Sequence, residues 1–195
     1  MRIAELSLNK QLELYKIIID WDLKQKSMQE NSKLKNYHSK LDTSSLSRER
    51  VRASEDDHQM EFVDEINGIA YVNDSKSIRL SATRNSLEAI ETSVVLIVGG
   101  NDADNDYSVL ARQIKEKVIA IVYLGKYSNA ILQHYSKHPM LFAKANSIRE
   151  AIQISSAYAK SGDVVLFSPA CEAYKEFDNY KKRGNEFKAA IKQLS

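Results

Sequence analysis

From residue 58 onward, the chain alternates between short apolar runs and longer segments in which apolar residues recur every three or four positions. Short continuous runs are typical of strands buried on both faces of a parallel sheet, and the longer spacing is typical of helices with one apolar face. The predicted strands are residues 60–65, 69–72, 93–98, 118–124, 140–143 and 163–167. The predicted helices are residues 80–90, 107–117, 127–135, 147–160 and 180–194. This alternation indicates right-handed βαβ units.

Asn67-Gly68 separates the first two predicted strands. Both residue types tolerate positive φ, so this dipeptide predicts a two-residue hairpin turn and an antiparallel first strand. We therefore predict an α/β domain over residues 58–195. It is a Rossmann-like three-layer sandwich of about six strands, mostly parallel with one antiparallel hairpin strand.

The first 57 residues have a different pattern. Residues 7–29 carry a broad apolar stripe at helical spacing that includes Ile18 and Trp21. Residues 30–57 are polar and predict a linker with at most one short helix near residues 45–53. We expect an N-terminal helical arm and linker over residues 1–57, preceding the sheet domain. Two arrangements would cover the stripe: packing on the following domain, or a homo-oligomer formed through the N-terminal helix.

Charge and cysteine content narrow the class of protein. The 28 basic and 26 acidic residues leave a formal net charge of +2, which gives no electrostatic reason to expect nucleic acid or an anionic membrane as a partner. The lone cysteine, Cys171, excludes an internal disulfide and indicates a reducing compartment. Neither a signal peptide nor an apolar run of membrane-spanning length is visible. We expect a soluble cytoplasmic protein.

Candidate chemistry gathers where predicted strands end, because open α/β sheets bind ligands beyond the carboxyl ends of their strands. Asn73-Asp74-Ser75-Lys76 follows the second strand; Asn, Asp and Ser favour turns, but Lys76 has no such structural reason and is a candidate anion contact. The candidate ligand-binding residues are Asn73, Asp74, Ser75, Lys76, Arg79, Asn101, Ser168 and Tyr180. The sequence predicts no catalytic residue and no metal ligand.

Three further motifs have ordinary structural explanations. Gly99-Gly100 is not followed by a phosphate-binding fingerprint and predicts a tight turn. The acidic segment 101–106 lacks the glycine and final glutamate of a calcium loop, so we expect a solvated turn whose Asp106 caps the next helix. Cys171 has no base that the sequence places beside it, and small residues at this junction favour packing.

Several motifs in order resemble one family. They are His58-Gln59-Met60-Glu61-Phe62, Asn67-Gly68, Asn73-Asp74-Ser75-Lys76, Gly99-Gly100, Asn105-Asp106-Tyr107-Ser108, Gly162-Asp163-Val164-Val165-Leu166, Ser168-Pro169-Ala170-Cys171 and Arg183-Gly184-Asn185-Glu186-Phe187. Together they resemble the carboxy-terminal domain of the Mur ligases, most closely the D-glutamate-adding members. The first fifty or so residues take no part in this resemblance.

The resemblance implies an ATP-dependent amide ligation, in which a substrate carboxylate becomes an acyl phosphate that the amine of D-glutamate attacks. The family's central domain holds ATP and magnesium, and this domain closes over the nucleotide and brings the amino acid. We therefore expect no cofactor in this chain. ATP and Mg are expected only if the missing central domain is supplied.

Departures from the family's motifs fall at ligand positions. Gln59 stands in place of an arginine that reaches the nucleotide phosphates, Ile78 in place of a threonine hydroxyl, and Ala103 in place of a lysine. Glu172-Ala173 stand in place of Ala-Ser. Each lost contact to a desolvated carboxylate costs on the order of 1–3 kcal/mol.

Three functions remain open. The first is a diverged, stand-alone relative of the carboxy-terminal domain, kept for binding or regulation and inactive alone. The second is a fragment or split subunit of an ATP-dependent ligase that works with a separate Mur-ligase-type chain. The third is an independent anion- or nucleotide-binding module that uses Lys76, Arg79 and the amides near Gly99.

Overall fold

The computed structural model describes residues 51, 54, 56–99, 105–125, 131, 134–135, 140–173, 177 and 179–194. They belong to the second of the two units into which the chain divides, Thr43–Ser195. The predicted helical arm, residues 7–29, lies outside the described residues, as does most of the expected linker. None of the helices within the described ranges has the length and apolar content needed to cross a membrane.

Six strands of the described region form one sheet in the order β1-β2-β6-β3-β4-β5. The strands are β1 Glu61–Ile66, β2 Ile69–Asn73, β3 Val94–Val98, β4 Val118–Leu124, β5 Leu141–Ala145 and β6 Val164–Phe167. Only the β1–β2 pair is antiparallel among them. Asn67 and Gly68 take φ values of 54° and 76° at the hairpin turn. The predicted hairpin and the mostly parallel sheet are confirmed.

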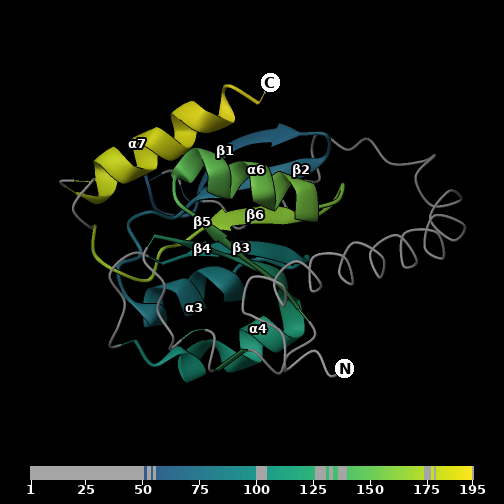
Figure 1. Cartoon of the computed structure of the whole chain (residues 1–195), viewed down its shortest axis with the longest axis vertical. Helices are drawn as coiled ribbons and strands as arrows, with labels where there is room; N and C mark the ends of the chain where they lie inside the picture. Colours follow the sequence, from purple (N-terminus) through teal and green to yellow (C-terminus); the bar gives the residue numbers. More distant parts are fainter. Residues whose placement is uncertain are drawn as a thin grey trace, which may run out of the picture. The chain divides into compact units, whose positions relative to one another are not determined.

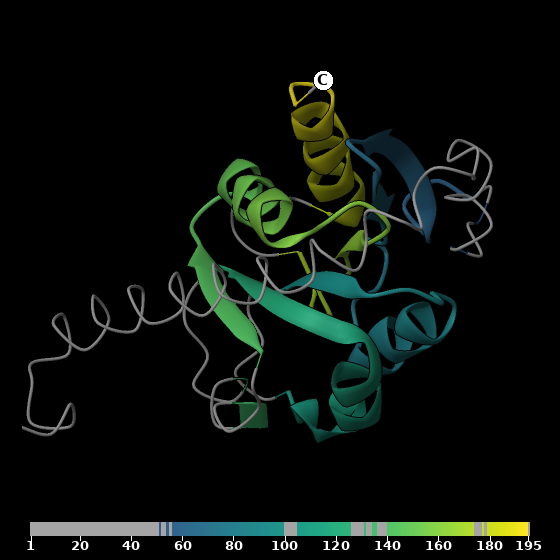
Figure 2. The ribbon, with the colours of Figure 1, turned by 90° about the vertical axis from the view of Figure 1, so that its right-hand side faces the viewer.

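Helices cover both faces of the sheet (Figure 1). One face carries α3 Leu80–Glu88 and α4 Ala111–Lys117, the latter entered through the 3₁₀ helix η2 Tyr107–Leu110. The other face carries α6 Ile148–Tyr158 and α7 Tyr180–Ile191. Figure 2 shows the same three layers after a quarter turn. The predicted three-layer α/β sandwich is thereby confirmed.

The core consists of two apolar clusters, one on each side of the sheet. In β3, Leu96 belongs to the cluster beneath α3 and α4, and its neighbours Val95 and Ile97 belong to the cluster beneath α6 and α7. Successive strand side chains point to opposite faces, so a fully apolar run such as β3 serves both clusters.

Local differences from the expected elements are small and have physical reasons. Asp106 caps η2 by accepting a hydrogen bond from the Ser108 amide, as predicted, and the helix then begins with a tight 3₁₀ turn. Val51, within the expected linker, forms an isolated antiparallel bridge with Ile90 and is 1% exposed. The linker segment therefore contributes an apolar side chain to the core. Of predicted helix 127–135, the structure describes residues 131, 134 and 135, and all three are helical.

Candidate ligand-binding edge

Two loops meet at the carboxyl edge of the sheet because their strands are neighbours. The Lys76 loop, residues 74–79, follows β2, and the Cys171 loop, residues 168–173, follows β6. The register pairs Asn73 with Phe167, and the Asp74 amide donates to the Phe167 carbonyl at 2.9 Å. The parallel pairing therefore brings the two loops side by side at the carboxyl edge, where the sequence predicts that candidate ligand-binding residues gather.

Asp74 lies completely buried between these loops and α3. Its Oδ2 accepts hydrogen bonds from the hydroxyls of Ser86 at 2.6 Å and Ser168 at 2.7 Å. Its Oδ1 accepts from the Met60 amide at 3.2 Å, and Thr83 is joined to Ser168 at 2.8 Å. Burial raises the pKa of Asp74, and the hydroxyl and amide donors act in the opposite direction. Both carboxylate oxygens thus bind the framework of the edge from within.

Asn73 connects the edge to β1 through a second polar network. Its Nδ2 donates to Glu61 Oε2 at 2.9 Å and lies 3.0 Å from His58 Nδ1, and Lys188 of α7 donates to Glu61 Oε1 at 2.8 Å. Burial acts to raise the pKa of Glu61, but the donors Lys188, the His58 amide and Asn73 together lower it. Burial, followed by the charge of Lys188, lowers the pKa of His58. The network keeps the Asn73 amide fixed beneath the loop.

Ser75 has almost no free space because α7 passes directly over it. A Cβ added to Gly184 would lie 2.3 Å from Ser75 Oγ and 2.2 Å from His58 Nδ1. Ser75 is fully buried, and its Oγ has no hydrogen-bond partner within the described part of the chain. The glycine of the Arg183-Gly184 motif therefore permits close packing of the helix on the Lys76 loop.

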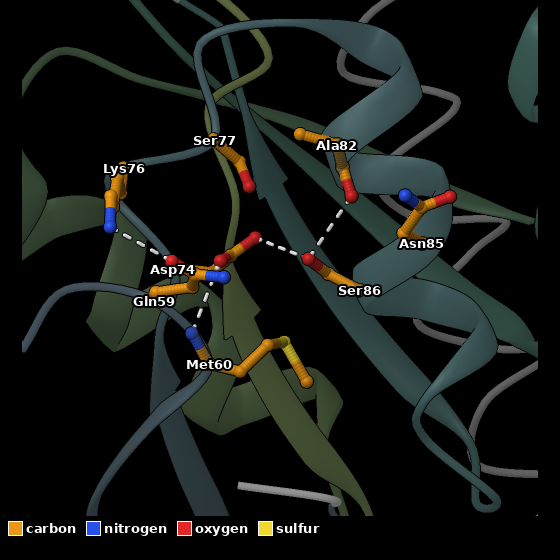
Figure 3. Close-up of a pocket in the computed structure, with 8 residues that line it drawn as sticks. All are labelled: Gln59, Met60, Asp74, Lys76, Ser77, Ala82, Asn85 and Ser86. Atoms are coloured by element: carbon orange, nitrogen blue, oxygen red, sulfur yellow. Dashed lines mark hydrogen bonds between the residues drawn. The ribbon is translucent and has the colours of Figure 1, made fainter. Parts of the chain in front are cut away.

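An open depression of ≈ 340 Å³ lies beside the loop, and Figure 3 shows the residues that line it. Its lining combines the apolar side chains of Met60 and Ala82 with polar groups of α3, and Lys76 stands at its rim (Figure 3). Lys76 is exposed, and its Nζ donates to Gln59 Oε1 at 2.9 Å. The depression thus has a cation whose described hydrogen-bond partner is neutral.

Arg79 and Tyr180 are not among the residues that line this depression. Arg79 is exposed at the start of α3 and makes no side-chain capping bond there. Tyr180, partly exposed at the start of α7, meets His58 edge-on with ring centroids 5.9 Å apart. Asn101 lies outside the described residues. The structure therefore brings Asn73, Asp74, Ser75, Lys76 and Ser168 together, with Tyr180 reaching them through His58.

Sequence reasoning missed the residues that hold the edge in place. Ser86 and Thr83 sit on the inner face of α3 and gave no signal beyond an amphipathic spacing. His58, Glu61 and Arg183 lie within motifs of the resemblance, which was their only signal. Among residues that the structure describes, no group of three His, Cys, Asp or Glu side chains has an arrangement suited to a metal ion.

The geometry defines a class: a three-layer α/β domain whose ligand edge is built from the loops after β2 and β6. The family described as "Mur ligase, glutamate ligase domain" matches residues 58–171, more than half of the chain. The chain therefore belongs to the Mur ligase family through this domain. The resemblance inferred from its motifs is confirmed.

Relatives of known name match the same region. The chain is 41% identical over 138 residues to UDP-N-acetylmuramoylalanine–D-glutamate ligase of Cytophaga hutchinsonii, covering 71% of this chain and 31% of that protein. It is 39% identical over 139 residues to the enzyme of the same name from Pelodictyon phaeoclathratiforme, covering 71% and 30%. The solved UDP-N-acetylmuramate-alanine ligase MurC of Thermotoga maritima is similar at 13% identity with a TM-score of 0.47, covering 71% of this chain and 30% of that chain. The chain spans about a third of the length of the curated relatives it matches.

Proposed function

We propose that residues 58–194 form a ligand-binding domain that takes a small anion at Lys76 and does not carry out amide ligation by itself. In this proposal it is a diverged, stand-alone relative of the carboxy-terminal domain of the D-glutamate ligase, a pseudoenzyme. The contact between Lys76 and Gln59 carries the proposal. Because the exposed ammonium group is bonded to a neutral amide at the rim of a depression, its charge is available to an anion.

Two substitutions at the same edge argue against the family's own ligands, ATP and D-glutamate. Gln59 accepts a hydrogen bond from Lys76, so a neutral acceptor stands where the resemblance implies a second cation facing a phosphate. Ile78 is 37% exposed and presents an apolar side chain where the resemblance implies a hydroxyl. Both changes weaken the binding of ATP phosphates and of D-glutamate, and favour a smaller anion.

A second candidate function is a split subunit or fragment of an ATP-dependent ligase. The intact framework supports it, since Asp74, Ser168 and Gly184 keep the loops in one defined arrangement. In that case ATP and magnesium bind to a central domain supplied by another Mur-ligase-type chain. The DNA flanking the gene separates the two candidates, because the split-ligase candidate requires a phosphate-loop domain encoded beside it, and the absence of such a domain there removes this candidate.

The same proposal includes a cellular compartment and an oligomeric state. We place the protein in the cytoplasm, where the UDP-linked substrate of its named relatives would be met. Self-association through the helix predicted over residues 7–29 is the proposed assembly. Changing Ile18 and Trp21 to polar residues should then reduce the mass measured by light scattering to that of a monomer, and an unchanged mass contradicts it.

Isothermal titration calorimetry of the whole chain tests the binding function. Inorganic pyrophosphate, D-glutamate and ATP are titrated into the wild type, into Lys76→Met, and into Lys115→Met, which removes an exposed lysine of α4. We expect binding of pyrophosphate that Lys76→Met weakens by about tenfold or more, the loss of one charge-assisted contact, and that Lys115→Met leaves unchanged. Equal affinities in the three proteins contradict the site. ATP-dependent joining of D-glutamate to UDP-N-acetylmuramoylalanine by the chain alone contradicts the pseudoenzyme.

A further inference from the structure

Arg183 of α7 is a buried cation at the back of the two edge loops. It is 2% exposed, and its described hydrogen-bond acceptors are three backbone carbonyls and the Cys171 sulfur, the last at 4.0 Å. Its Nη2 donates to the carbonyls of Ser75 at 2.9 Å and Cys171 at 3.1 Å, and its Nη1 donates to the Glu172 carbonyl at 3.3 Å. A guanidinium taken out of water is costly unless its donors are hydrogen-bonded, and here three backbone carbonyls accept from it.

The contact to Ser75 fixes one particular peptide group, the one that joins Ser75 to Lys76. The Ser75 carbonyl of this group accepts from Arg183, and the Lys76 N–H of the same group donates to the His58 carbonyl at 2.9 Å. Because a peptide unit is planar, holding its oxygen on one side and its N–H on the other fixes its orientation. The position of the Lys76 Cα, which belongs to the same planar unit, is thereby set.

The same guanidinium nitrogen joins the two loops. Nη2 bonds both the Lys76 loop, at Ser75, and the Cys171 loop, at Cys171. A backbone contact between the loops, from the Ala170 amide to the Ser77 carbonyl at 3.0 Å, lies beside it. A lysine at position 183 has a single ammonium group and lacks the planar fork that reaches three carbonyls at once.

We propose that Arg183 is the positioning residue of this edge: it holds the Ser75–Lys76 peptide against the Cys171 loop from α7. Its effect on anion affinity rests on the function proposed above for Lys76. Its effect on loop conformation does not, because these contacts lie within the chain itself. The two statements can therefore fail separately.

Hydrogen exchange of the unliganded whole chain tests the positioning role. The amides of Lys76, Ser77 and Ala170 report on the loops, and the amides of α6 report on the rest of the domain. In Arg183→Met and Arg183→Lys we expect exchange at the three loop amides to speed up by about tenfold or more, with α6 unchanged. Arg149→Met, which removes an exposed arginine of α6, should leave all of these rates at the wild-type value.

Arg183→Lys separates positioning from charge, since it keeps a cation but cannot bridge the loops. We expect it to lose affinity for pyrophosphate to the same degree as Arg183→Met, and millimolar methylguanidinium to restore the slow loop exchange in Arg183→Ala. Wild-type exchange and affinity in Arg183→Lys overturn the inference, as does faster exchange spread equally over loops and α6. If Arg183→Met does not fold, the lysine variant decides. A wild type that fails to bind pyrophosphate overturns the proposed function, and the exchange rates still decide the role of Arg183.

Discussion

Ser168 donates a hydrogen bond of 2.7 Å to Asp74, a residue 94 positions earlier in the chain. The bond joins the end of β6 to the loop after β2, and Ser86 of α3 donates to the same carboxylate oxygen at 2.6 Å. A single buried side chain therefore connects two strand ends and a helix. This contact holds the start of the Lys76 loop in place, because Asp74 is the first residue of that loop.

Removing the Ser168 hydroxyl should destabilise the domain. Ser168→Ala deletes one donor to a buried carboxylate and also leaves Thr83 without its partner at 2.8 Å. We expect the free energy of unfolding to fall by about 1.5–3 kcal/mol, the range for hydrogen bonds to charged groups. Urea denaturation measures it, with Ser81→Ala at an exposed position of α3 as the control, expected within about 0.5 kcal/mol of wild type. Equal midpoints for Ser168→Ala and the wild type would show that the bond adds no stability.

Gly184 should not tolerate alanine, although it lies within a helix. In an open helix, glycine to alanine stabilises by about 1 kcal/mol through helix propensity. Here the new Cβ would lie 2.2 Å from His58 Nδ1 and 2.3 Å from Ser75 Oγ, so the loop or the helix must move. Overpacking of this kind costs about 1–3 kcal/mol, and we expect a net loss of stability in thermal denaturation.

The adjacent position supplies the matched control for Gly184→Ala. Asn185 is exposed on the same helix, so Asn185→Ala should be neutral or slightly stabilising. A rise in the melting temperature of Gly184→Ala comparable with that of the control would mean that the helix and the Lys76 loop are not in close contact.

The sequence predicts the backbone of this edge well because local signals determine it. Asn67-Gly68 forms the predicted turn with both φ values positive, and the predicted strand over residues 118–124 agrees with β4 at both ends. Neighbouring parallel strands then place the Lys76 loop beside Ser168, which is a topological consequence that needs no knowledge of side chains.

Side-chain partners across the sheet could not be predicted in the same way. The partners of Asp74 on α3 and β6 are serines, a residue type common on any helix or strand end, and only the strand register shows that they meet. Likewise, Val51 lies in a polar stretch, and its burial against Ile90 has no periodic signal. A charged residue such as Arg183 is expected on the exposed face of a helix. Its burial is explained only by its contacts with the two loops, which are distant in the sequence.

The stability of the domain should depend on pH through His58. Burial and the charge of Lys188 lower the pKa of His58 below 6.5, whereas Glu61 and Asp57 oppose this effect. Since the unfolded chain then takes up the proton more readily than the folded one, stability falls as the pH drops from 6.5 toward the folded-state pKa. Below that pKa, protonation of His58 causes no further loss of stability.

His58→Asn isolates this contribution. Asparagine tolerates the positive φ of 67° at this position and does not titrate, so its unfolding free energy should vary less with pH than that of the wild type. Urea denaturation at several values between about pH 7.5 and pH 5 measures the difference, in the range where histidine titrates. The pKa of Glu61 is lowered from its ordinary value of 4.5, so Glu61 titrates below the pH range of this experiment and does not affect the comparison. Parallel stability curves for the two proteins would exclude His58 as the source.

Gln59 should limit anion affinity at the edge. It is exposed and gives Lys76 a neutral hydrogen-bond acceptor at 2.9 Å, so Gln59→Arg replaces that acceptor with a second cation at the same rim. An arginine offers a planar fork that pairs with two oxygens of a phosphate, and one additional charge-assisted contact corresponds to about tenfold in affinity. We expect tighter binding of pyrophosphate by about that factor in isothermal titration, with a steeper decrease as salt is added. Gln193→Arg makes the same substitution at an exposed position beyond α7 and should leave the affinity unchanged. If both arginine variants raise the affinity equally, the gain comes from net charge and not from the neighbourhood of Lys76.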